Sequence, residues 1–229
     1  MKKYTTLLFD ADNTLLDFTM AENRAIEATC NAYKIPFSSS VAGLYSNIND
    51  TFWKRFEKGE ITRDVVKIGR FERFLSAVGS DAPPKEVALY YMEQLANGGF
   101  LINGAADMLK TLCSLYDMYI ITNGTSWIQK KRLALSGINK YFSGCFISED
   151  MGCQKPEKAY FDYVLAHIPE KDKNKICIIG DSMSSDILGG INSGINTCYF
   201  SPGGKSGTYI PTYTAKNFDQ ILTLFKDLK

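Results

Sequence analysis

The sequence predicts an α/β protein whose core is a doubly wound parallel sheet, with an all-helical segment inserted after the first strand. Beyond residue 98, short apolar runs alternate with helical patterns, which is typical of a parallel sheet covered by helices on both faces. Residues 20–97 show helical periodicity alone, so the apolar run Tyr4–Phe9 joins the later strands only across an insertion. We therefore expect an α/β domain at residues 1–16 and 98–229 and a helical domain at 17–97.

Each expected strand is a short apolar run that stops at polar residues, and each expected helix repeats its apolar residues with a helical period. The strands are Tyr4–Phe9, Met118–Thr122, Cys145–Ser148, Ile176–Ile179 and Thr197–Phe200. The inserted helices are 22–33, 41–58, 61–78 and 84–96, the last opening with prolines that suit a first helical turn. The remaining helices are 105–115, 127–135, 157–166 and 184–192.

Composition argues against polymeric anionic partners and against a membrane protein. The chain has 26 Lys and Arg against 25 Asp and Glu, without a long run of either sign, so neither nucleic acid nor a membrane surface is an expected partner. No apolar run is long enough to span a bilayer, and the apolar stretch near the N-terminus is too short and too acidic for a signal peptide. Six cysteines without C-x-x-C spacing predict buried thiols in a reducing compartment, and hence the cytoplasm.

The single histidine, His167, limits the mechanisms that the chain could use. It falls at the end of an expected helix, where a structural or surface role is the ordinary one. Mechanisms built on Ser-His-Asp, Cys-His or two zinc-binding histidines would all depend on this residue. The sequence therefore favours chemistry carried by carboxylates.

Polar residues follow several expected strands, at the edge where ligands bind in doubly wound sheets. They are Asp10 and Asp12, Thr122 and Asn123, Lys155 in the loop after a strand, and Asp181 and Asp186. Asp10 can attack phosphorus without a general base because a carboxylate is already ionised at neutral pH. Asp12 is placed two residues further along to give a proton to the leaving group and later to take one from water.

The other strand-end residues suit a metal ion and a phosphoryl group. Asp181 and Asp186 lie in a strand-to-helix turn opened by Gly180, where their carboxylates can hold Mg²⁺ against Asp10. Thr122 would contribute a hydroxyl donor and Lys155 a positive charge to the phosphoryl oxygens. Catalysis would then rest on positioning and electrostatics.

In this set the chain resembles the haloacid dehalogenase superfamily over essentially its whole length. Asp10-x-Asp12-x-Thr14 is similar to the superfamily's first motif, Thr122 to its second, Lys155-Pro156 to its third, and Gly180-Asp181 with Asp186 to its fourth. The resemblance implies Asp10 as nucleophile, Asp12 as acid-base, and Mg²⁺ held by Asp10, the main-chain carbonyl of Asp12, Asp181 and Asp186. Residues 17–97 match the placement of a type I helical cap, which closes over small substrates.

A finer likeness is to the pyrimidine 5'-nucleotidase branch, from the segment Phe9-Asp10-Ala11-Asp12 and the following Thr14-Leu15. Asn13 stands where many relatives have glycine, and asparagine tolerates an unusual backbone angle. We expect an Mg²⁺-dependent phosphatase acting on nucleoside 5'-monophosphates, as a monomer or homodimer. Specificity would come from Asn123 and from residues of the cap, namely Phe18, Asn47, Asn49, Trp53, Arg63 and Arg70.

Three other functions stay open at this point. A sugar-phosphate phosphatase or a mutase like β-phosphoglucomutase would retain both aspartates of the first motif. A non-enzymatic phospho-acceptor signalling domain uses a similar acidic cluster, but it has no place for the large helical insertion. A dehalogenase is disfavoured, because displacing halide requires no proton donor at Asp12.

Overall fold

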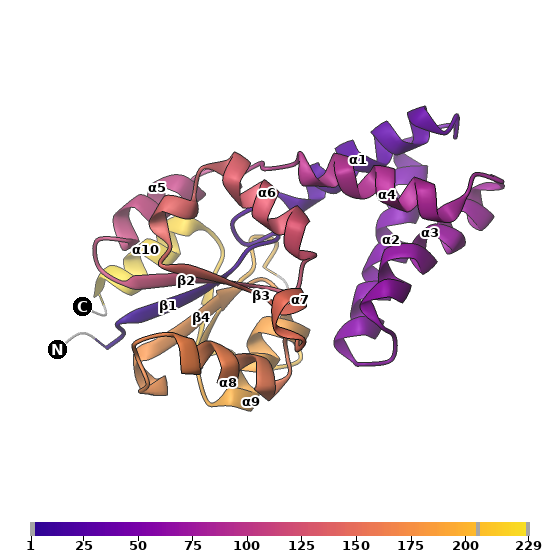
Figure 1. The fold of residues 1–229 in the computed structure, drawn as a ribbon. Coiled ribbons are helices and arrows are strands. Elements are labelled where there is room, and N and C mark those ends of the chain that lie inside the picture. Colours follow the sequence, from indigo (N-terminus) through magenta and orange to yellow (C-terminus); the bar gives the residue numbers. More distant parts are fainter. Residues whose placement is uncertain (1–2, 205–206, 228–229) are drawn as a thin grey trace. The chain divides into compact units, whose positions relative to one another are not determined.

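The computed structural model describes residues 3–204 and 207–227 of the chain. The chain separates into two compact units, which are drawn in Figure 1. The first, Met1–Asp17 with Leu101–Lys229, is called the α/β unit, and the second, Phe18–Phe100, the helical unit. The sequence-based division at residues 17–97 stands close to these bounds, and the role of the helical unit as a cap stays a prediction.

The described part of the α/β unit contains a six-stranded sheet in the order β3-β2-β1-β4-β5-β6. Every neighbouring pair is parallel, as predicted for a doubly wound sheet. β1 (Thr6–Asp10) lies between β2 (Asp117–Thr122) and β4 (Ile176–Gly180). β3 (Gly144–Ile147) follows β2 at one side, and β5 (Asn196–Phe200) and β6 (Tyr213–Ala215) follow β4 at the other.

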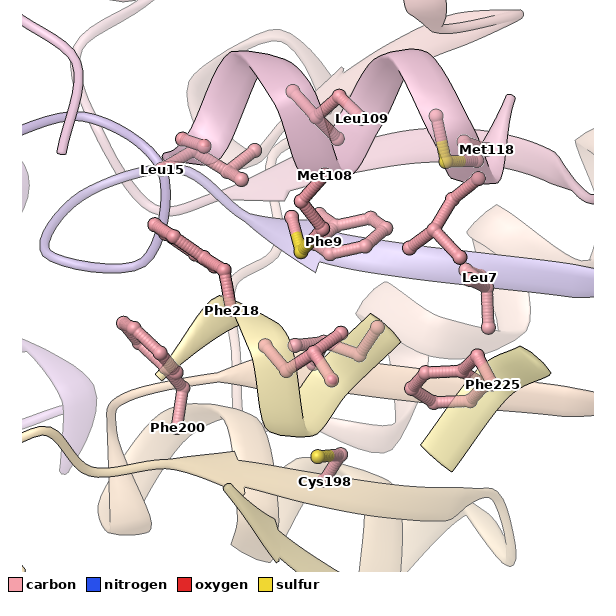
Figure 2. Packing of buried hydrophobic residues seen from close by; sticks show 14 of the residues in the cluster. Leu7, Phe9, Leu15, Met108, Leu109, Met118, Cys198, Phe200, Phe218 and Phe225 are labelled. Atoms are coloured by element: carbon pink, nitrogen blue, oxygen red, sulfur yellow. The ribbon is translucent and has the colours of Figure 1, made fainter. Parts of the chain in front are cut away.

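The central strands are buried on both faces because helices cover both. Their side chains alternate, so that Leu7 and Phe9 of β1 pack on one face while Leu8 packs on the other. The first face is covered by α5 (Ala105–Leu112) and α10 (Phe218–Asp227), and Figure 2 shows Phe9 packed among their side chains. The second face is covered by α8 (Lys158–His167) and α9 (Leu188–Ser193). Burying each large apolar side chain contributes about 1.5–3 kcal/mol.

The helical unit contains α1 (Phe18–Ala32), α2 (Ser39–Glu57), α3 (Arg63–Val78) and α4 (Pro84–Ala96). Its helix ends follow ordinary capping chemistry. Ser38 and Thr62 accept hydrogen bonds at the starts of α2 and α3, and Gly79 ends α3 with φ of 68°. The interior is aromatic, with the ring of Tyr45 lying 5.0 Å from that of Tyr91 between centroids.

Several elements differ from the sequence-based expectation. Ser148, expected in a strand, begins the short helix α7 (Ser148–Met151). The helix expected at 184–192 is a π-helical turn, Met183–Ile187, followed by α9. The structure adds β6, α10 and two 3₁₀ turns, Asn139–Tyr141 and Lys173–Lys175, and it gives α6 the bounds Ser126–Ser136.

The cysteines and His167 test two further expectations. All six cysteines are unpaired, but Cys113 and Cys145 are exposed, so the prediction of uniformly buried thiols is wrong for these two. His167 is exposed at the end of α8 and stacks on Tyr163, as expected of a surface histidine. In the parts of the chain that the structure describes, no helix combines the length and apolarity needed to cross a membrane.

Candidate active site

Three aspartates meet at the carboxyl edge of the sheet. Asp10 is the last residue of β1, and Asp181 and Asp186 follow β4, the strand next to it. Each offers a carboxylate oxygen within 4.8 Å of the others. Thr14 lies beside them and donates a hydrogen bond of 3.4 Å to Asp181. The parallel register of β1 and β4 thus brings together residues that are far apart in the sequence.

The turn after β4 places the Asp186 carboxylate beside the end of that strand. The Asp186 carboxylate accepts a 3.1 Å hydrogen bond from the main-chain nitrogen of Ser182. A Cβ atom at Gly180 would lie 2.2 Å from a carboxylate oxygen of Asp186, so only glycine leaves room for it. The π-helical turn Met183–Ile187 carries Asp186, in keeping with the frequent use of such turns at functional sites.

Lys155 is buried and its ammonium bridges two of the carboxylates. Nζ lies 2.6 Å from Oδ1 of Asp10 and 2.7 Å from Oδ1 of Asp186. The lysine is held by Asn123, whose amide donates to the main-chain oxygen and accepts from the main-chain nitrogen of Lys155, both at 2.9 Å. The structure therefore gives Asn123 a positioning contact with Lys155, and its predicted substrate contact stays a prediction.

The electrostatics of the cluster follow from burial. Burial raises the pKa of Asp10 well above its ordinary value, the Asp186 and Asp181 carboxylates raise it further, and Lys155 opposes them. Burial, with Asp186 beside it, raises the pKa of Asp181 to about 7. For Lys155, burial lowers the pKa, but Asp10 and Asp186 outweigh it and hold the pKa well above its ordinary value. The ammonium is thus retained while the carboxylates crowd one another.

The donor set fits a hard divalent cation. Carboxylate oxygens are the ligands that Mg²⁺ prefers, and those of Asp10, Asp181 and Asp186 converge on one point. Three ionised carboxylates exceed the charge of the Lys155 ammonium that faces them, so an added cation would relieve their repulsion. The Asp12 carboxylate binds Gln129 and Arg132 instead, and a metal contact through the main-chain carbonyl of Asp12 stays a prediction.

Asp12 is bound by two buried residues of α6 that the sequence-based reasoning did not find. Arg132 donates to Oδ1 of Asp12, and Gln129 donates to Oδ2 at 2.9 Å. Gln129 also donates to Oγ1 of Thr122 at 2.9 Å and accepts from Arg132 at 2.9 Å. Asp12 and Thr122, which the sequence placed at two different strand ends, are therefore linked through one side chain.

A signal for these residues was present in the sequence. The buried face of α6 is formed by Ile128, Gln129, Arg132 and Leu133, a spacing that in ordinary core helices is apolar throughout. Arg132 is among the largest fully buried side chains of the described residues. Buried polar side chains need partners, so polar residues inside an apolar stripe indicate a polar site.

The predicted specificity residues of the helical unit are spread over different environments. Arg70 is 4% exposed and donates to the side chain of Asn49, whose amide donates to Glu22 at 2.8 Å. The structure thus gives Arg70 a partner inside the helical unit, and its predicted contact with substrate stays a prediction. Asn47 is exposed on α2, and the half-buried Trp53 lies edge-on to Phe56, with centroids 5.7 Å apart.

A doubly wound parallel sheet thus carries three aspartates and a lysine at one carboxyl edge. Residues 4–194 match the haloacid dehalogenase-like hydrolase family, and the chain belongs to it. The predicted superfamily and the prediction of a hydrolase enzyme are thereby confirmed.

Relatives with high coverage support a finer placement. The chain is 40% identical over 223 residues to YfnB of Bacillus subtilis, named as a HAD-hydrolase, covering 96% of this chain and 95% of that protein. It is 35% identical to the pyrimidine 5'-nucleotidase PynA of Streptococcus pneumoniae, covering 96% of this chain and 94% of that protein. It is 30% identical to the pyrimidine 5'-nucleotidase YjjG of Escherichia coli, covering 96% of each. The resemblance to the nucleotidase branch is therefore confirmed.

A solved structure agrees with the fold. The crystal structure of Bacillus subtilis YfnB bound to magnesium, described as revealing interdomain movement, superimposes with a TM-score of 0.93 at 39% identity and covers 98% of this chain and 99% of that one. A haloacid dehalogenase of Xanthobacter autotrophicus has the same fold, with a TM-score of 0.80 at 16% identity, covering 99% of this chain and 100% of that one.

Proposed function

We propose that this chain is an Mg²⁺-dependent phosphatase that hydrolyses nucleoside 5'-monophosphates through an aspartyl-phosphate on Asp10. The observation that carries the proposal is the buried ion cluster of Asp10, Lys155 and Asp186 at the carboxyl edge of the sheet. Burying a lysine between two carboxylates costs desolvation free energy, so its retention suggests that the site uses a fixed positive charge. Binding a phosphoryl group is such a use.

Asp10 is the nucleophile in this proposal. One of its oxygens attacks phosphorus, a bond forms between that oxygen and phosphorus, and the bond between phosphorus and the ester oxygen breaks. The Lys155 ammonium, 2.6 Å from Asp10, opposes the rise in the Asp10 pKa that burial causes, and it would stabilise charge on the phosphoryl oxygens. Water then attacks phosphorus, the bond between phosphorus and the Asp10 oxygen breaks, and inorganic phosphate leaves with Asp10 restored as a carboxylate.

Asp12 carries the protons of both steps. In the first step its carboxyl gives a proton to the departing alkoxide, and in the second its carboxylate takes a proton from the attacking water. Each cycle therefore returns Asp12 to its starting state. Its partly exposed side chain, bound from behind by α6, is compatible with such exchange.

The remaining groups bind the phosphoryl group or position the residues that bind it. Thr122 donates its hydroxyl to a phosphoryl oxygen, and Asn123 fixes the loop that presents Lys155. Mg²⁺, held by Asp10, Asp181, Asp186 and the main-chain carbonyl of Asp12, would supply positive charge that offsets both the phosphoryl group and the crowded carboxylates.

The nucleotide specificity rests on similarity to PynA and YjjG, both named pyrimidine 5'-nucleotidases, and on the helical unit acting as a cap. Among the predicted specificity residues of the helical unit, Asn47 is exposed and Phe18, Trp53 and Arg63 are half-buried, so these side chains keep surface that a substrate could contact. The partner is a small phosphorylated metabolite. A cytoplasmic location, and a monomeric or homodimeric state, stay predictions from the sequence.

The test is phosphate release from a panel of nucleoside 5'-monophosphates and sugar phosphates, with and without Mg²⁺. We expect Mg²⁺-dependent release that favours nucleotides and is lost in Asp10→Asn. Equal rates on sugar phosphates would remove the nucleotide assignment. Accumulation of a positional isomer of a sugar phosphate would indicate a mutase, and stable phosphorylation without turnover a phospho-acceptor domain.

A further inference from the structure

Two fully buried polar residues of α6 stand behind the groups that would do the chemistry. Gln129 and Arg132 are each 1% exposed, and both bind the same carboxylate, that of Asp12. A buried arginine and a buried amide are expensive to desolvate, so their retention calls for a specific partner. Here the partner is the proposed acid-base.

The hydrogen bonds of Gln129 fix the orientation of its amide. Nε2 has two hydrogens, and it donates one toward Asp12 and one toward Thr122, both at 2.9 Å. Oε1 accepts from Arg132 at 2.9 Å. With the amide turned over, its oxygen would face the carboxylate of Asp12 and its NH₂ group would face the Arg132 guanidinium, so both contacts would be repulsive. The amide is therefore locked in one orientation between two functional side chains.

The contact with Gln129 also sets the direction of the Thr122 hydroxyl. Its oxygen accepts from Gln129 at 2.9 Å and from the main-chain nitrogen of Gly124 at 3.2 Å. A hydroxyl has two acceptor positions and one donor, so filling both acceptor positions leaves the O–H to donate. In the proposed reaction that donor faces the phosphoryl group.

Arg132 completes the arrangement by holding the other oxygen of Asp12. A carboxyl group has about four lone-pair positions, so donors from Arg132 and Gln129 leave room for the proton that Asp12 would give to a leaving group. The two contacts restrict rotation of the carboxyl group. They arise from one helix face, because residues 129 and 132 are three apart.

We propose that Gln129 and Arg132 are positioning residues for hydrolysis, which together orient the Asp12 acid-base, while Gln129 also orients the Thr122 hydroxyl toward the phosphoryl group. This inference rests on the proposed function. It assigns to α6 a role that is separate from the metal and from the nucleophile. Its signature is a dependence on the leaving group, because only a poor leaving group needs a proton from Asp12.

The test compares two esters. A nucleoside 5'-monophosphate expels an alkoxide, which needs a proton, whereas p-nitrophenyl phosphate expels a stable phenolate, which does not. The quantity measured is kcat/KM, since it covers the steps up to formation of the aspartyl-phosphate. The variants are Arg132→Met and Gln129→Met, which keep apolar bulk at each site. The matched control is Lys131→Met, the loss of an exposed positive charge on the same helix.

For Arg132→Met we expect kcat/KM to fall about 10²-fold on the nucleotide and less than about threefold on p-nitrophenyl phosphate. For Gln129→Met we expect about the same fall on the nucleotide, with a fall of about tenfold on p-nitrophenyl phosphate through the misplaced Thr122 hydroxyl. Arg132→Lys should recover part of the nucleotide activity, which a purely structural role would not require. Lys131→Met should match the wild type.

Suppose that wild type and Lys131→Met hydrolyse both esters. If Gln129→Met and Arg132→Met then match the wild type, or lose activity on the two esters equally, the positioning role is overturned and the phosphatase assignment stands. If wild type hydrolyses neither ester, both proposals fail. Thermal unfolding of each variant shows whether it is folded. Should Arg132→Met not fold, the difference between the two esters in Gln129→Met decides the question alone.

Discussion

Replacing Lys155 by methionine should destabilise the metal-free protein strongly, because it removes the cation that pairs with two buried carboxylates, those of Asp10 and Asp186. Nζ lies 2.6 Å from Asp10 and 2.7 Å from Asp186, and the lysine side chain is 2% exposed. Breaking a buried ion pair by removing one partner costs about 3–5 kcal/mol. For a chain of this length that corresponds to a fall in Tm of about 6–20 °C.

The matched control is Lys158→Met, at an exposed lysine on α8. Lys158 pairs with Asp162 at 2.6 Å, but its side chain is 58% exposed, and a surface pair of this spacing contributes only about 0.3–0.5 kcal/mol. Both variants exchange the same residue types and both lose a short ion pair. Lys155→Met loses two buried ion pairs and Lys158→Met one exposed pair, so the difference between their Tm values measures what the buried cluster contributes to stability.

The assay is calorimetry with EDTA and with Mg²⁺. The pH is set well above the Asp181 pKa of about 7, so that protonation of Asp181 does not reduce the repulsion between the carboxylates. Mg²⁺ should raise the Tm of Lys155→Met more than that of the wild type, because it replaces part of the missing positive charge. If the two lysine variants lose the same Tm, or if Mg²⁺ stabilises wild type and Lys155→Met equally, the electrostatic account of the cluster is wrong.

Three further outcomes are expected. Because burial raises the pKa of Asp181 to about 7, the folded metal-free protein binds more protons at this site than the unfolded chain, and the folded state becomes less stable as pH rises toward 7. The increase in Tm that Mg²⁺ causes should therefore grow with pH. An increase that shrinks with pH would contradict the assignment of the metal site. Gly180→Ala should cost about 1–3 kcal/mol and weaken Mg²⁺ binding measured by calorimetric titration, since its Cβ would displace a carboxylate, whereas Gly43→Ala, with open space around it, should be neutral or stabilising. Arg70→Leu should destabilise the protein by about 1–3 kcal/mol by leaving the buried side-chain oxygen of Asn49 without its donor, and an altered KM at unchanged Tm would support Arg70 as a substrate-binding residue.

The position of the aspartate cluster could be predicted because it depends on one rule about parallel sheets. Asp10 and Asp181 each follow a short apolar run, and the carboxyl ends of parallel strands lie at one edge. Once the helical stretch is recognised as an insertion, β1 must join the later strands. The chemistry of the residues then needs no knowledge of individual contacts.

Elements that depend on pairing were harder to predict. β6 has three residues, too few to show a period of two, and its place is set by its register with β5. The π-helical turn before α9 has no pattern of its own in the sequence, because it differs from an α-helix by one extra residue in a turn. In both cases the neighbouring structure, rather than the local sequence, decides the conformation.

Two buried arginines, Arg70 in the helical unit and Arg132 in the α/β unit, show that residue type alone is a weak guide to a functional site. Arg70 is predicted to be a specificity residue because a polar group could bind the edge of a base, yet it contacts Asn49 from another helix and the ring of Tyr91. Arg132 has no predicted role, and the two lysines before it in the sequence give no sign of a buried position. The distance in sequence from a strand end distinguishes Arg132 from Arg70 better than their shared charge does. Arg132 falls on the apolar face of α6 with Gln129, directly after a strand end that carries Thr122, whereas Arg70 falls on the apolar face of a helix with no strand end beside it. A buried polar residue close in sequence to a strand end is thus the stronger indication of chemistry.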